Sequence, residues 1–215
     1  MGGKIEEIFN ECGAILKGHF VLAEMGHSGT YLQKAILYRN PVIFENLCRI
    51  MAHEVSSKFT SIEAVVGPAP IGSVLAQRVA FYLGETYQKM VVPLFTEKDG
   101  AGEHLLRRGF NKDLVGKNVL VVDDVMTSGT SILQIIKAVL ASKGQMVAAA
   151  VICDRGEVAL NNLFQMFPVM SLSRLKPRIW TENDCSLCKE KIPIDADVGR
   201  GWEFLKSHPG YPSNK

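Results

Sequence analysis

The segment 118–131 combines a pair of carboxylates with a run of small hydroxyl residues, and together these could bind a phosphorylated ligand. Asp123 and Asp124 end an apolar run, and the sequence TSGTS follows at 127–131. Backbone N–H groups of such a loop can converge on an anion, because Gly129 permits a positive φ and the hydroxyls add donors. A helix that begins behind the loop would add its unpaired N–H groups and the positive end of its dipole. The loop is therefore predicted to hold a phosphate.

The acid pair predicts a second binding function. Two adjacent carboxylates at a strand end repel each other, which is tolerated when they bind sugar hydroxyls or a divalent cation. A purely structural interpretation, in which Asp124 ends a strand and a hydroxyl caps a helix, leaves Asp123 and Gly129 unexplained. The site is thus expected to bind a phosphorylated sugar. The loop lacks the G-K-[ST] of an ATPase and the G-x-G-x-x-G of a dehydrogenase.

Continuous apolar runs predict the strands that would position these residues. The runs lie at 63–67, 90–95, 118–124 and 146–154, with helical stretches between several of them. This pattern is typical of a parallel sheet buried on both faces in an α/β domain. Before it we expect a helix over 4–16 that stops near Gly18, strands in 19–24 and 29–37, and a helix from Pro41 through Val55. The expected parts are 1–60 with the N-terminal helices, the α/β core at 61–173, and a Cys-containing appendage and tail at 174–215.

Composition limits the classes of partner. The 215 residues include 24 Lys and Arg against 22 Asp and Glu, a net charge of +2, so nucleic acid and anionic membrane surfaces are not expected partners. No apolar run approaches the roughly 18 residues of a membrane span, and the first residues lack the apolar region of a signal peptide. Five cysteines in a chain of this size favour reduced thiols. A cytoplasmic protein is expected.

The stretch VVDDVMTSGTS at 121–131 resembles the 5-phosphoribosyl 1-diphosphate (PRPP) signature of the type I phosphoribosyltransferases. The resemblance implies their α/β fold, with a mostly parallel central sheet flanked by helices and a small N-terminal hood. It also implies that Asp123 and Asp124 are catalytic and meet the ribose hydroxyls, with Mg²⁺ bound to PRPP nearby. The residues implied to enclose the 5-phosphate are Met126, Thr127, Ser128, Gly129, Thr130 and Ser131, and Val125 is also implied to bind PRPP.

Four further segments, at 26–35, 67–80, 95–110 and 153–157, are similar to the orotate phosphoribosyltransferase branch. That resemblance implies transfer of phosphoribosyl from PRPP to orotate, which gives orotidine 5′-monophosphate and diphosphate in pyrimidine biosynthesis. It implies a homodimer with shared active sites. The residues implied to lie beneath the diphosphate are Ala69, Pro70, Ile71 and Gly72, and those implied to contact orotate are Lys34, Thr127 and Arg155.

The charged segment 95–110 corresponds to the mobile catalytic loop of that family. Cations there could stabilise the diphosphate as negative charge builds on it. We expect Lys98 and His104 to bind PRPP and Lys98 to act as the main catalytic cation, with His104, Arg107 and Arg108 as alternatives for that cation. A solvated hairpin is the competing interpretation of such a charge run.

Arg155 follows an apolar strand whose end should share a sheet edge with the acid pair. A planar guanidinium suits a carboxylate through two parallel hydrogen bonds, as an orotate-type base requires. The alternative is a surface arginine paired with Asp154 or Glu157. A phosphoribosyltransferase for uracil or a purine has no use for this guanidinium. A PRPP-sensing regulator that does not turn over its ligand should show a basic face that binds nucleic acid. The net charge of +2 gives no sign of such a face.

Cys185 and Cys188 form a C-x-x-C in the appendage, which supplies half of a tetrahedral zinc site. Further ligands would come from a partner chain or from His19, His53 or His208. The preferred interpretation is a tight turn that packs the appendage, with Trp180 and Ile192 as apolar anchors.

Overall fold

The structure, a computed structural model, describes residues 2–23, 25–156 and 166–214. These residues form two compact units, each built from segments that are distant in the sequence. The first contains residues 1–5 and 41–175, and the second contains 6–40 and 176–215. Within the described residues, no helix is long and apolar enough to cross a membrane.

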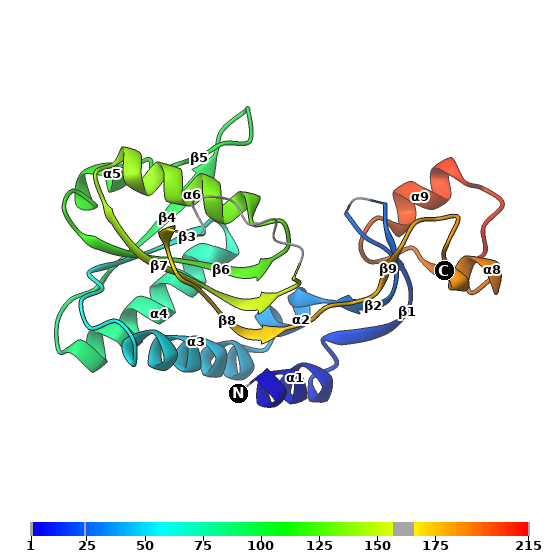
Figure 1. The fold of residues 1–215 in the computed structure, drawn as a ribbon, viewed down its shortest axis with the longest axis horizontal. Helices are drawn as coiled ribbons and strands as arrows, with labels where there is room; N and C mark the ends of the chain where they lie inside the picture. Colours follow the sequence, from blue (N-terminus) through cyan, green and yellow to red (C-terminus); the bar gives the residue numbers. More distant parts are fainter. Residues whose placement is uncertain (1, 24, 157–165, 215) are drawn as a thin grey trace. The chain divides into compact units, whose positions relative to one another are not determined.

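The first unit is built on a six-stranded sheet with the order β5-β4-β3-β6-β7-β8 (Figure 1). Neighbouring strands run parallel except at β5, which is antiparallel to β4. The expected mostly parallel sheet is therefore confirmed. Its strands are β3 (Ala64–Pro68), β4 (Val92–Lys98), β5 (His104–Leu105), β6 (Asn118–Met126), β7 (Gln145–Asp154) and β8 (Val169–Arg174).

Helices cover both faces of this sheet, with α3 and α4 on one side and α5 and α6 on the other (Figure 1). Side chains on both faces of the sheet therefore pack against helices, which explains why the sequences of β6 and β7 are continuous apolar runs. One core cluster joins Val66, Val121 and Val151 of the sheet to Ile132 and Ile136 of α6. The helices are α3 (Pro41–Ser56), α4 (Ile71–Tyr87), α5 (Phe110–Asp113) and α6 (Thr130–Ala141).

The second unit has a five-stranded sheet with the order β11-β10-β1-β2-β9. A small core of Val21, Ile194 and Phe204, with Leu205 and Tyr211 packed against it, lies in this unit. Most of α1 also belongs to it. The strands are β1 (Ile15–Val21), β2 (His27–Leu32), β9 (Ile179–Trp180), β10 (Ile194–Asp195) and β11 (Ser213–Asn214). The helices are α1 (Gly2–Glu11), α2 (Lys34–Arg39), α8 (Ser186–Lys189) and α9 (Gly201–Ser207).

Two expectations for the N-terminal region were wrong at their boundaries. The helix expected over 4–16 ends at Glu11, because Gly13 adopts a φ of 73° and the N–H of Ala14 bonds the carbonyl of Phe9 at 2.8 Å. The strand expected over 29–37 ends at Leu32, and α2 follows it. The helix expected from Pro41 is confirmed as α3.

The two units also divide the chain differently from the three expected parts. Helix α3 lies in the unit of the α/β core, where it packs against α4. The appendage shares a sheet with the N-terminal hairpin, because β10 pairs with β1 and β9 pairs with β2. Residues 6–40 and 176–215 therefore form one unit across the length of the chain.

Candidate active site

The carboxyl ends of four parallel strands meet at one edge of the first unit's sheet. In register, Pro68 of β3 lies beside Thr96 of β4, and Met126 of β6 lies beside Asp154 of β7. The segments that follow these strands therefore open onto the same edge, where ligands of α/β sheets gather. They are the loop at 69–70, the β4–β5 arm (residues 95–110), the loop at 127–129 and Arg155.

The acid pair lies at the end of β6 and is almost fully buried, with Asp123 8% and Asp124 7% exposed. The backbone N–H of Asp124 donates to Oδ1 of Asp123 at 2.8 Å, and that of Val125 donates to Oδ1 of Asp124 at 2.6 Å. These short bonds fix both carboxylates at the strand end. Two adjacent carboxylates of this kind fit a hard divalent cation or the hydroxyls of a sugar.

The hydroxyl-rich loop connects the acid pair to α6. Gly129 adopts a left-handed conformation with a φ of 78° immediately before the helix, and no side chain there caps it. The Ser128 and Thr130 hydroxyls are 3.0 Å apart. Helix α6 has twelve residues, and its first-turn N–H groups stand next to the strand end that carries the carboxylates. This geometry would suit an anion.

The loop between β3 and α4 depends on close contact between two glycines. A Cβ on Gly67 would lie 2.1 Å from the carbonyl oxygen of Gly72, and one on Gly72 would lie 2.3 Å from the ring of Pro68. The N–H of Ala69 donates to the carbonyl of Thr96 at 2.9 Å, which ties the loop to β4. Ala69 and Pro70 are exposed at the sheet edge.

The β4–β5 arm is a hairpin that carries the predicted cations. Lys98 pairs in register with His104, and Oδ1 of Asp99 accepts the N–H groups of Ala101 and Glu103 at the tip, at 2.8 and 2.9 Å. Lys98 is exposed beside this tip. The arm is thus a hairpin with an ordered turn and exposed cations, an arrangement that both the catalytic-loop and the solvated-hairpin interpretations allow.

Of the two arginines in the arm, Arg108 is held by other residues of the arm. Its guanidinium donates to Oε1 of Glu97 at 2.8 Å and lies 5.9 Å from the ring centroid of Phe95. This hydrogen bond lowers the pKa of the Glu97 carboxyl. Arg107 is exposed. Lys98 and Arg107 are therefore better placed than Arg108 to meet an anionic ligand.

His104, on β5 of the arm, is buried and contacts residues of both β4 and α6. Its Nδ1 lies 2.8 Å from the hydroxyl of Thr96, and its Nε2 lies 3.3 Å from that of Ser131 in the first turn of α6. Burial lowers the pKa of His104, and the positive charge of Lys98 lowers it further. A neutral ring at pH 7 favours a hydrogen-bonding link between β4 and α6 over the role of a cation. Sequence reasoning did not identify Thr96.

Arg155 follows β7, and its N–H donates to the carbonyl of Met126 at 2.9 Å, so its backbone adjoins the phosphate loop. Asp154, one of the partners considered for it, accepts the Nε–H of Arg174 at 2.9 Å and the N–H of Gly156 at 2.7 Å. Glu157, the other, lies outside the described residues.

Most of the remaining predicted residues lie in the second unit. Lys34 is the exposed first residue of α2. Cys185 and Cys188 adjoin His19 and His27, whereas His53 belongs to α3 of the first unit. The expected apolar anchors were wrong in part, since Ile192 is 38% exposed while Phe204 is buried in the unit's core.

A family model of the phosphoribosyl transferase domain matches residues 34–182, more than half of the chain. The chain belongs to this family. This membership confirms the resemblance inferred from the PRPP signature and makes the chain a pentosyl-group transferase.

Curated relatives of this phosphoribosyl transferase are named orotate phosphoribosyltransferase. The protein from Thermoanaerobacter sp. strain X514 is 38% identical over 194 residues, which cover 89% of this chain and 94% of the relative. The one from Caldanaerobacter subterraneus subsp. tengcongensis is 36% identical over 193 residues, with the same coverage.

Solved structures show the same fold. The orotate phosphoribosyltransferase of Aeropyrum pernix superposes on this phosphoribosyl transferase with a TM-score of 0.63 at 25% identity, covering 80% of this chain and 94% of that one. The adenine phosphoribosyltransferase of Thermoanaerobacter pseudethanolicus, at 16% identity, has a TM-score of 0.55 over 68% of this chain and 88% of its own. The expected type I phosphoribosyltransferase fold is confirmed.

Proposed function

We propose that this chain is an orotate phosphoribosyltransferase, which converts PRPP and orotate to orotidine 5′-monophosphate and diphosphate. The observation that carries the proposal is the match, over 89% of the chain, to relatives that bear this name. The arrangement at the carboxyl edge of the sheet supports it, because an acid pair, a phosphate-binding helix end and a candidate base-binding arginine follow adjacent strands.

In this proposal PRPP lies across the end of β6. The carboxylates of Asp123 and Asp124 accept hydrogen bonds from the ribose hydroxyls, while residues 126–131 enclose the 5-phosphate. Backbone N–H groups and the positive end of the α6 dipole offset the charge of the phosphate, so no nearby lysine is needed. Mg²⁺ bound with PRPP would neutralise part of the diphosphate charge, and the two carboxylates are donors that it prefers.

The diphosphate is the leaving group and lies between the loop at 69–72 and the β4–β5 arm. Lys98 is the cation proposed to stabilise the negative charge that builds on it, with Arg107 also exposed on the arm. The bond from ribose C1 to the diphosphate oxygen breaks, and a bond from C1 to the orotate nitrogen forms. The orotate proton leaves to solvent. Closure of the arm would keep water from the cationic ribose.

Orotate is placed by its carboxylate. Arg155 can form two parallel hydrogen bonds with it, and its backbone adjoins the phosphate loop through Met126. Thr127 lies in that same loop. The resemblance implies a homodimer in which the sites are shared.

The test is a panel of bases offered to the full chain with PRPP and Mg²⁺, with diphosphate release as the readout. Release with orotate, and not with uracil, adenine or hypoxanthine, is expected. Release with one of the other bases in place of orotate would assign a different phosphoribosyltransferase. No release with any base, combined with tight PRPP binding, would overturn the proposal in favour of a PRPP-sensing regulator.

A further inference from the structure

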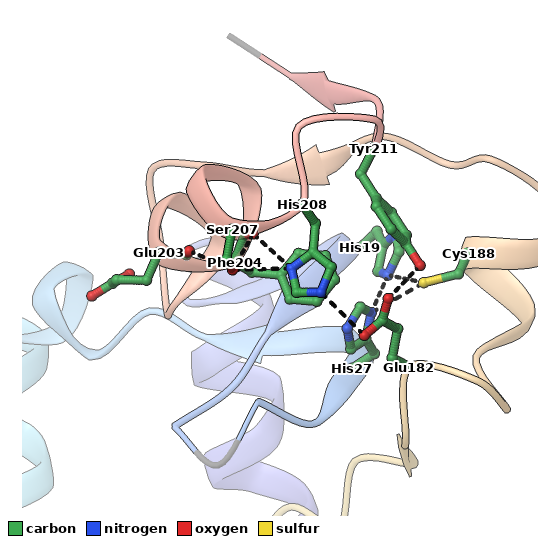
Figure 2. Close-up of polar contacts among 9 residues, drawn as sticks. All are labelled: His19, His27, Glu182, Cys188, Glu203, Phe204, Ser207, His208 and Tyr211. Atoms are coloured by element: carbon green, nitrogen blue, oxygen red, sulfur yellow. Dashed lines mark hydrogen bonds and ion pairs between the residues drawn. The ribbon is translucent and has the colours of Figure 1, made fainter.

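Two histidines and two cysteines converge inside the second unit. His19 lies on β1 and His27 on β2, while Cys185 immediately precedes α8 and Cys188 lies within it. One ligand atom from each residue lies within 4.8 Å of the other three. Figure 2 shows Cys188 directed toward the two imidazole rings.

The distances between these atoms suit a single tetrahedral ion. Nε2 of His19 lies 3.6 Å from Sγ of both Cys185 and Cys188, and Nδ1 of His27 lies 3.2 Å from Sγ of Cys188. Tetrahedral zinc with Zn–S of about 2.3 Å and Zn–N of about 2.0 Å separates nitrogen and sulfur ligands by about 3.5 Å. The two ring nitrogens are 2.8 Å apart and need to separate by only about 0.5 Å to reach the corresponding spacing.

A hydrogen bond outside the cluster orients His19 for this role. Its Nδ1 lies 2.8 Å from the carbonyl oxygen of Ile192. A carbonyl can only accept, so Nδ1 carries the proton and the lone pair of Nε2 points into the cluster. Metal-binding histidines use this arrangement to fix their tautomer and ring orientation.

His27 has no comparable hydrogen bond outside the cluster in the described part of the chain, although its ring is buried. The residue is fully buried, and Nε2 has no hydrogen-bond partner in the described part of the chain. Its ring stands edge-to-face with Phe204 at a centroid distance of 4.8 Å. A neutral His27 that binds a metal through Nδ1 keeps its proton on Nε2, so every polar contact of the ring is made through the nitrogen that faces the cysteines.

We propose that His19 Nε2, His27 Nδ1, Cys185 Sγ and Cys188 Sγ hold one structural zinc ion. Four protein ligands fill a tetrahedral site and leave no position for substrate, which distinguishes it from a catalytic zinc. Two thiolates balance the charge of Zn²⁺, so the filled site is neutral in its buried position. The soft thiolates favour zinc over the magnesium that accompanies PRPP.

The place of the ion explains what it does for the fold. The histidines come from the N-terminal hairpin and the cysteines from the appendage, so the ion would join the two segments of the second unit. These segments otherwise share strands of only two residues, β9 and β10, and a small apolar core. Small units of this kind commonly need a metal or a disulfide for stability. The proposal is independent of the catalytic one.

Metal analysis of the purified full chain is the first test. One zinc per chain is expected after extensive desalting. Cys185→Ser with Cys188→Ser should reduce the zinc content at least tenfold, whereas Cys12→Ser, at a half-buried cysteine outside the cluster, should retain it. A wild-type chain that contains no zinc and takes up none on refolding with zinc present, or a double variant that keeps its zinc, would overturn the proposal.

A second measurement does not depend on the folding of a variant. Cobalt substituted into the wild-type chain should give the intense visible bands of a tetrahedral site and a sulfur-to-cobalt charge-transfer band. Removal of the metal with a chelator should accelerate amide exchange in 15–32 and 179–207 at least tenfold while 64–154 changes little. A six-coordinate cobalt spectrum, or exchange that is unaffected by the chelator, would contradict the proposed site.

Discussion

At the scale of single residues, buried polar side chains mark both sites of this protein. Burial of a polar group is costly unless it is paired or has a ligand. In the first unit, Asp123, Asp124 and His104 are buried at the sheet edge, and in the second, His19 and His27 are buried beside the cysteines. The largely apolar core elsewhere makes these two groups stand out.

The acid pair should be required for turnover. Asp123→Asn with Asp124→Asn retains size and removes both charges, and we expect formation of orotidine 5′-monophosphate to fall at least about 100-fold, because the amides bind ribose hydroxyls and Mg²⁺ poorly. Steady-state kinetics would measure this, with Asp113→Asn on α5 as the exposed matched control. A double variant as active as the control would remove the pair from the mechanism.

Arg155 should set the affinity for the base. Arg155→Lys replaces a planar fork with a point charge, so KM for orotate should rise about 10- to 100-fold while KM for PRPP changes little. Arg174→Lys is the matched control, because Arg174 pairs with Asp154 on the neighbouring strand. Equal orotate KM values in the wild type and Arg155→Lys would show that another residue binds the carboxylate.

His104 should make stability sensitive to acid. Its folded-state pKa is lowered by burial and by Lys98, against a smaller opposing effect of Glu103. The unfolded chain therefore takes up the proton first, and stability falls as pH drops below about 6.5. Urea unfolding between pH 7.5 and 5 should show a smaller acid loss in His104→Gln than in the wild type. Parallel pH profiles would mean that His104 titrates alike in both states.

Which site residues the sequence could predict depends on their separation. The acid pair and the phosphate loop are contiguous, so a single stretch predicts both. His104 meets Thr96 and Ser131 only in the folded chain, and His27 meets Cys188 across 161 residues. The signal that could have identified His27 is its position across a short hairpin turn, opposite Val21 and so two residues along the strand from His19.

At the scale of elements, strands buried on both faces were predictable because every residue must be apolar. The strands β3, β4, β6 and β7 coincide with the four apolar runs of the sequence. The end of α1 could not be predicted, because apolar residues continue at helical spacing past Gly13. The backbone conformation of Gly13 ends the helix. Strands of two residues, such as β9 and β10, carry no periodic signal and form only through their partners.

The loop between β3 and α4 should not tolerate a side chain at Gly67. Gly67→Ala puts a Cβ against the backbone of Gly72, and we expect a loss of about 1–3 kcal/mol or more of unfolding free energy, because a backbone carbonyl cannot move aside cheaply. Gly100→Ala, at a tip position with open space and no positive φ, is the control. Denaturant unfolding compares them, and equal stability of the two variants would contradict the close contact.

At the scale of the whole molecule, residues 6–40 and 176–215 form one unit, while residues 41–175 form the other together with residues 1–5. Sequence patterns divide a chain into consecutive parts, so the pairing of the appendage with the N-terminal hairpin could not be predicted from them. The near-balanced net charge of +2 fits a protein that holds a highly phosphorylated small molecule through local groups rather than through its overall field.

The central claim is tested most directly by mixing the full chain with PRPP, Mg²⁺ and orotate and identifying the nucleotide product by mass and retention time. Orotidine 5′-monophosphate should form in step with diphosphate, and its formation should stop when PRPP is omitted. Failure of a folded, PRPP-binding chain to form this product would contradict the account.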